Sequence, residues 1–63
     1  MIREAIAKLV EGKMITGHEA LLTMRQIMDG ETTPAQIAAY LTALRMCGET
    51  PEVIAGSATA MRE

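Results

Sequence analysis

Aromatic residues are almost absent from this chain of 63 residues, which has no Trp or Phe and a single Tyr, Tyr40. The one cysteine, Cys47, excludes an internal disulfide. The one histidine, His18, has no second histidine or cysteine at ligand spacing, so no metal site is predicted. The chain has six Lys and Arg and eight Asp and Glu residues, with both signs scattered along it. This balance lacks the basic stripe of a nucleic-acid interface and the polybasic cluster of a membrane anchor.

Long hydrophobic runs are also missing, since no apolar stretch approaches the roughly 20 residues needed to span a bilayer. Charge appears at once in Met1-Ile2-Arg3-Glu4, which does not resemble a secretory signal peptide. With the lone cysteine, these features predict a cytoplasmic protein. Hydrophobic residues nevertheless make up 49% of the chain, mainly Ala, Ile, Leu and Met. Because Ala, Leu and Met are strong helix formers, the composition favours an all-α fold with a thin core.

The first half of the chain predicts two helices. Apolar residues at helical spacing mark the first over residues 2–10, and Gly12 follows as a left-handed cap. Thr16 and Glu19, three residues apart, form a capping box that begins a second helix over residues 17–28. We expect its buried face to hold Ala20, Leu21, Met24, Ile27 and Met28, and its outer face to hold His18, Thr23, Arg25, Gln26 and Asp29.

The second half predicts two more helices, each begun by Thr-Pro. Thr33 caps the third, over residues 34–46, with Gln36 completing a capping box. Its apolar surface is wide, so we expect this helix to be central or to serve two partners. The fourth covers residues 51–62, and its apolar set is Val53, Ile54, Ala58 and Met61. Its small residues Gly56 and Ser57 form a thin spot, where a neighbouring helix could pack closely. We predict an all-α fold without a sheet, a small four-helix bundle with orthogonal or up-and-down packing.

Few side chains are candidates for chemistry. His18 on a first helical turn is interpreted as a solvated surface residue, and Cys47 as a buried, unreactive thiol. Met24, Met28 and Met61 are interpreted as core fillers, whereas Met14 and Met46, at helix edges, are the better candidates for a contact surface. The corner 48–50 resembles that of a helix-turn-helix, but the helix after it has no base-reading side chain before Arg62. No catalytic, cofactor-binding or metal-binding residue is predicted.

Several motifs together resemble the amino-terminal helical domain of the anthranilate phosphoribosyltransferase family. They include Ile27-Met28-Asp29-Gly30-Glu31, the run from Thr33 to Leu41, and Leu44-Arg45-Met46 followed by Gly48-Glu49-Thr50-Pro51-Glu52. The resemblance covers essentially the whole chain. It implies a glycosyltransferase-class parent that transfers a phosphoribosyl group from phosphoribosyl pyrophosphate to anthranilate in tryptophan biosynthesis, with magnesium. The α/β domain that carries the donor and magnesium sites in this family has no counterpart among residues 1–63, so residues 1–63 alone are expected to be inactive.

In the family this helical domain walls the active-site cleft and builds the dimer interface. The resemblance and the apolar composition therefore predict either a homodimer through the first and third helices or docking on the α/β domain. The alternatives are a stand-alone interaction module, the equivalent domain of a pyrimidine nucleoside phosphorylase, and a DNA-binding module. The candidate interface residues, which an inner core would equally explain, are Ile2, Ile6, Leu9, Val10, Tyr40, Leu41 and Leu44.

Overall fold

The computed structural model describes residues 1–63 and consists of four helices without a strand. The helices are α1 (Ile2–Val10), α2 (Gly17–Met28), α3 (Pro34–Cys47) and α4 (Pro51–Arg62). The predicted all-α fold is confirmed, and α3 ends one residue later than the sequence predicted. No helix is both long and apolar enough to cross a membrane.

Local hydrogen bonds at the helix ends explain why the boundaries could be predicted. The Thr16 hydroxyl accepts from the Glu19 amide at 3.1 Å, and the Glu19 carboxylate accepts from the Thr16 amide at 2.7 Å. Thr33 and Gln36 form the same reciprocal box, with distances of 3.1 and 2.9 Å. Gly12, the predicted left-handed cap of the first helix, has positive φ, as do Gly30 and Gly48, which follow the second and third helices.

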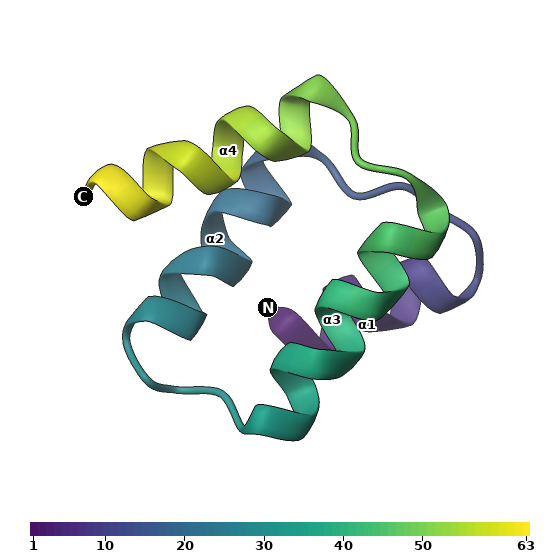
Figure 1. The fold of residues 1–63 in the computed structure, drawn as a ribbon, viewed down its shortest axis with the longest axis horizontal. Coiled ribbons are helices and arrows are strands. Elements are labelled where there is room, and N and C mark those ends of the chain that lie inside the picture. The colour runs from purple at the N-terminus through teal and green to yellow at the C-terminus, as the bar shows by residue number, and fades with distance from the viewer.

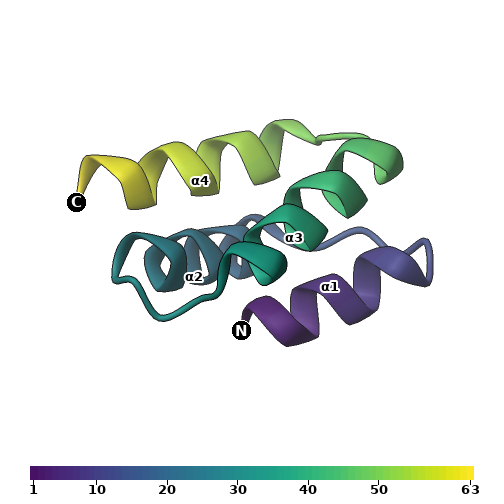
Figure 2. The ribbon, with the colours of Figure 1, turned by 60° about the horizontal axis from the view of Figure 1, so that its bottom comes forward.

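The helices form two pairs in a flat molecule of 29 × 25 × 15 Å (Figures 1 and 2). Helix α4 packs along α2 in parallel, since Gly17 at the start of α2 lies against Glu52 and Gly56 in the first half of α4, and Arg25 in the last turn of α2 pairs with Glu63 just after α4. Helix α3 packs along α1, and the Cys47 thiol donates to the carbonyl of Leu9 at 3.1 Å.

Helices α1 and α2 run antiparallel and join the two pairs. At one end the Ile2 amide donates to Oε1 of Gln26 at 2.8 Å, and at the other the Lys8 ammonium reaches the Glu19 carboxylate. The Ile2–Gln26 bond has a second role, because Met1 provides no side-chain cap for α1. An amide that helix geometry leaves without an intrahelical partner is thus satisfied by a side chain from another helix.

Helices α2 and α4 cross with close backbone contact at Gly17 and Gly56. A Cβ atom built on Gly56 would lie 2.1 Å from the Gly17 carbonyl oxygen, and one on Gly17 would lie 2.7 Å from that of Glu52. Only glycine therefore allows the two backbones to approach this closely. The predicted thin spot at Gly56 is confirmed, and its partner Gly17 had not been foreseen.

The core lies between the helix pairs and extends into the α1–α2 connection. Its largest wholly buried side chains include Tyr40, Ile2, Val53 and Thr23. The prediction that Thr23 faces outward was wrong, because its hydroxyl donates to the carbonyl of Glu19 at 2.8 Å and needs no solvent. Apart from Thr23, the buried residues are Ile2, Ala5, Leu9, Ile15, Ala20, Tyr40, Ala43, Leu44, Val53 and Ala60.

Two further expectations about packing were wrong. Helix α3 is not central, because α1 and α2 each pack against two helices whereas α3 packs extensively against α1 alone. The alternative expectation, that α3 serves two partners, stays a prediction. Met28 and Met61 do not fill the core but are exposed, as is Ile54 of the predicted apolar set of α4. The helices form a flat arrangement of pairs, so one apolar stripe on α3 and one on α4, which includes Ile54 and Met61, remain uncovered; Met28 is exposed at the last residue of α2.

Candidate functional site: two apolar surfaces

The structure divides the seven candidate interface residues between the core and the surface. Ile2, Leu9, Tyr40 and Leu44 are buried in a single core cluster, and partly buried Ile6 packs against it. The two others are exposed on different surfaces, as described below. An interface between subunits would therefore use the exposed members of this set together with neighbours that sequence reasoning assigned elsewhere.

The first surface, called here the α1/α3 face, lies where the C-terminal ends of α1 and α3 come together. Val10 is 70% exposed and Met46 is 82% exposed, both unusually high for large apolar side chains. They border a hollow of about 350 Å³ that is lined also by Leu9, Gly12, Ala43 and Cys47. Cys47 is half-buried there, so the prediction of a buried thiol is met only in part.

The second surface, called here the α3/α4 groove, lies between α3 and α4. These helices diverge from the corner at residues 48–50 in both views (Figures 1 and 2). The groove has a volume of about 330 Å³ and exposes Leu41 by 51%, Ile54 by 55% and Met61 by 60%. Glu49 is the only charged residue in its lining, which is completed by Met24, Tyr40, Leu44, Val53, Ser57 and Ala58.

Tyr40 is a lining residue of the α3/α4 groove and is also the most voluminous wholly buried residue. Its hydroxyl has no hydrogen-bond partner in the structure. Burial raises the pKa of this phenol above its ordinary value of 10.0, because the ionised form would lose its hydration. A buried hydroxyl without a partner carries a cost in stability, typically about 1–3 kcal/mol.

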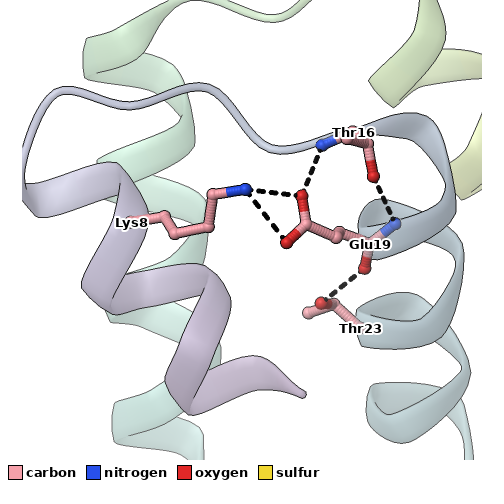
Figure 3. Close-up of polar contacts among 4 residues, drawn as sticks. All are labelled: Lys8, Thr16, Glu19 and Thr23. Carbon is pink, nitrogen blue, oxygen red and sulfur yellow. Dashed lines mark hydrogen bonds and ion pairs between the residues drawn. The ribbon is translucent and has the colours of Figure 1, made fainter.

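The most connected polar group is Glu19, which links α1 to the start of α2 (Figure 3). The Lys8 ammonium donates to its two carboxylate oxygens at 2.9 and 3.1 Å. The bond from Lys8, followed by that from the Thr16 amide, lowers the pKa of Glu19. Lys8, Thr16 and Glu19 cap or join helices, and Thr23 bonds to a carbonyl within α2, so all four groups in Figure 3 have structural roles.

The remaining candidates for chemistry lie apart from one another. His18 is exposed, as predicted. No three His, Cys, Asp or Glu side chains are grouped in a way that would hold a metal ion. The Arg25 guanidinium donates to the Glu63 carboxylate, which lowers the pKa of Glu63. The two apolar surfaces are therefore the candidate sites carried forward.

Sequence reasoning missed the role of Ile54 and Met61 in a surface. Both were placed in the apolar set of the fourth helix, and Met61 was interpreted as a core filler; the two lie seven residues apart on α4. An apolar stripe has the same spacing whether it is buried in the core or exposed as a contact surface, so periodicity alone does not distinguish core from surface. The exposed Met46 was foreseen because it lies at a helix end, whereas Met14, also proposed for a contact surface, borders neither surface.

A family model for the helical bundle domain of a glycosyl transferase family matches residues 3–63. The chain belongs to this family. It is 57% identical over 63 residues to the anthranilate phosphoribosyltransferase of Anaeromyxobacter dehalogenans. This match covers 100% of this chain and 19% of that relative. It is 58% identical over 62 residues to the enzyme of the same name from Dehalococcoides mccartyi, covering 98% of this chain and 18% of the relative.

The anthranilate phosphoribosyltransferase of Pelobacter propionicus is 57% identical over 63 residues, covering 100% of this chain and 18% of the relative. The helical-domain resemblance inferred from the motifs is therefore confirmed. The chain spans less than a fifth of the length of these relatives and corresponds to their amino-terminal part. No solved structure matches the chain.

Proposed function

We propose that residues 1–63 serve as the assembly domain of an anthranilate phosphoribosyltransferase. The observation that supports this proposal is similarity over almost the whole chain. The glycosyl transferase helical bundle domain matches residues 3–63, and three anthranilate phosphoribosyltransferases are 57–58% identical to the chain. The parent enzyme would act in the cytoplasm and transfer a phosphoribosyl group from phosphoribosyl pyrophosphate to anthranilate. The relatives reported above favour this activity over that of a pyrimidine nucleoside phosphorylase.

Magnesium and phosphoribosyl pyrophosphate belong, in this proposal, to the remainder of the parent enzyme. Residues 1–63 do not fit either group, because the carboxylates are dispersed at helix ends and none are clustered as cation ligands. The two hollows described above are lined mostly by apolar side chains, which are unsuited to a polyphosphate. These residues contribute contact surfaces.

The α1/α3 face is proposed as the homodimer interface. Apolar patches left uncovered on a water-exposed domain mark contact surfaces, and Val10 and Met46 are its two most exposed large apolar residues. Sedimentation equilibrium of this chain is expected to show a reversible dimer. Met46→Glu should abolish the dimer, because it places a charge inside the contact, whereas Ile54→Glu in the α3/α4 groove should leave it intact. A dimer that survives Met46→Glu would contradict this assignment.

The enzymatic proposal is tested by a chimera in which this chain replaces the matching residues of the Anaeromyxobacter dehalogenans enzyme. The chimera is expected to form phosphoribosyl anthranilate at a rate within about tenfold of that enzyme, since the exchanged surfaces would have the same partners. This 63-residue chain alone, as the control, should show no turnover. A folded chimera without activity would favour the stand-alone interaction module instead.

A further inference from the structure

The end of α2 holds the chain near both of its ends. Oε1 of Gln26 accepts a hydrogen bond from the Ile2 amide at 2.8 Å, and the neighbouring residue, Arg25, donates to both carboxylate oxygens of Glu63. Ile2 is the first residue of α1, and Glu63 comes directly after α4. Two consecutive residues of one helix therefore fasten the first helix of the domain and the point at which the chain leaves the last one.

The last turn of α4 is weakly held apart from this ion pair. Ala60 is the last buried residue of α4, and Met61, Arg62 and Glu63 are all exposed. The Glu63 amide lies 3.3 Å from the carbonyl oxygen of Ala60, which is a long hydrogen bond. Of the three exposed side chains, that of Glu63 alone forms a hydrogen bond. The direction of the chain at residue 63 therefore depends on Arg25.

We propose that Arg25 is a positioning residue of the parent enzyme, and that its ion pair with Glu63 is a latch that fixes the direction in which the polypeptide leaves this domain. This inference rests on the proposed function. The matched region is 18–19% of the relatives and corresponds to their amino-terminal part, so in a parent of similar length the polypeptide continues after Glu63. Because α2 is also bonded to α1 through Gln26, the latch fixes this direction relative to the α1/α3 face.

The Arg25 side chain has a second acidic neighbour, which allows the latch to open. Asp29 lies one turn further along α2, at the i+4 spacing at which side chains of a helix meet. The bond with Glu63 raises the pKa of Arg25, and the charge of Asp29 acts in the same direction. Arg25 and Asp29 both line an open hollow of about 290 Å³, so the guanidinium has room to turn from one carboxylate to the other.

The strength of the latch follows from its exposure. The side chains of Arg25 and Glu63 are 47% and 44% exposed, and an exposed ion pair shifts an equilibrium by up to about fivefold. Two parallel N–H···O bonds place this pair at the upper end of that range. The latch is therefore closed most of the time and still opens. In 1 M salt, where the Debye length is about 3 Å, screening should abolish its effect.

The test removes the positive charge in the chimera described above, with Arg25→Gln as the variant and Arg62→Gln as the matched control. Arg62 is exposed, lies at the end of α4 and forms no ion pair in the structure. In hydrogen exchange followed by mass spectrometry, the peptide that spans residue 63 should exchange about fivefold faster in Arg25→Gln and unchanged in the control. The reversed pair, Arg25→Glu with Glu63→Arg, should restore slow exchange.

The kinetics of the same chimeras provide a second measurement. Arg25→Gln should raise KM by up to about fivefold and leave kcat within about twofold, because only the fraction of molecules in the competent arrangement falls. Arg62→Gln should leave both constants unchanged. In 1 M NaCl the differences between Arg25→Gln and the unsubstituted chimera should disappear, in exchange and in KM.

Equal exchange in Arg25→Gln and the control would overturn the latch, and faster exchange with an unchanged KM would overturn the positioning role. A folded chimera without transfer activity contradicts only the proposed enzyme, and the exchange rates then decide on the latch. Should the chimera not fold, exchange is measured on this 63-residue chain extended by the roughly ten residues that follow in the Anaeromyxobacter dehalogenans enzyme. Faster exchange around residue 63 in Arg25→Gln supports the latch there, and unchanged exchange overturns it.

Discussion

Replacement of Gly56 by alanine tests the packing of α2 on α4 most directly. In an ordinary exposed helix this change would be stabilising by about 1 kcal/mol, because alanine has the higher helix propensity. Here the new Cβ would lie 2.1 Å from the carbonyl oxygen of Gly17 and 3.0 Å from its carbon. Non-bonded carbon–oxygen contacts in proteins lie at about 3.3 Å or more, so the helices would have to separate by about 1 Å.

The expected result is a net loss of stability. Overpacking costs typically about 1–3 kcal/mol, and this overlap is with backbone, which cannot move aside as a side chain would. Because backbone cannot yield, we take the upper end of this range, about 3 kcal/mol; less the propensity gain of about 1 kcal/mol, Gly56→Ala should lower the free energy of unfolding by about 2 kcal/mol, or Tm by about 10 °C for so small a domain. Gly17→Ala should cost less, because its Cβ would lie 2.7 Å from the Glu52 carbonyl oxygen.

Thermal and urea unfolding followed by circular dichroism at 222 nm measures these changes. Ser57→Ala is the matched control, since it raises helix propensity at the next position and adds no atom at the crossing. Its effect should stay within about 0.5 kcal/mol. A Gly56→Ala variant that is more stable than the parent chain would refute the close crossing of α2 and α4.

Three further predictions concern single polar groups. Tyr40→Phe should leave stability unchanged or raise it by up to about 1 kcal/mol, since it deletes a buried hydroxyl without a partner. Burial raises the phenol pKa on folding, which an ultraviolet titration of the folded chain checks. The contribution of Tyr40 to stability should therefore be fully present below about pH 10, the unfolded-state pKa, and be lost as pH rises through the folded-state pKa. A double-mutant cycle on Lys8 and Glu19 should give a coupling of about 0.5 kcal/mol at pH 7. Because the Glu19 pKa is lowered on folding, that coupling should be complete above the unfolded-state pKa of about 4.3 and vanish as pH falls through the folded-state value; a coupling that persists in acid contradicts the pair. Thr33→Ala should cost about 1 kcal/mol in urea unfolding, with Thr33→Ser as the neutral control, and equal stability of all three proteins would exclude the cap.

The sequence by itself determined where the helices begin and end. Caps are local: Thr16 and Thr33 bond to groups three residues away, and Gly12 and Gly30 take the left-handed conformation with no help from distant residues. For this reason three of the four helices have the predicted bounds, and the fourth differs by one residue. The family could also be inferred, since its motifs are continuous along the chain.

Only the tertiary structure decided which apolar residues are covered. Leu9 and Val10 are neighbours in one helix, yet Leu9 is core and Val10 is exposed. Ile54 and Met61 have the spacing of a buried stripe and face an open groove. The cap of α1 by Gln26 likewise depends on how α1 meets α2. Periodicity indicates that a helix has an apolar face. Whether that face is buried depends on which other helix packs against it, and this packing is set by contacts between residues far apart in the chain.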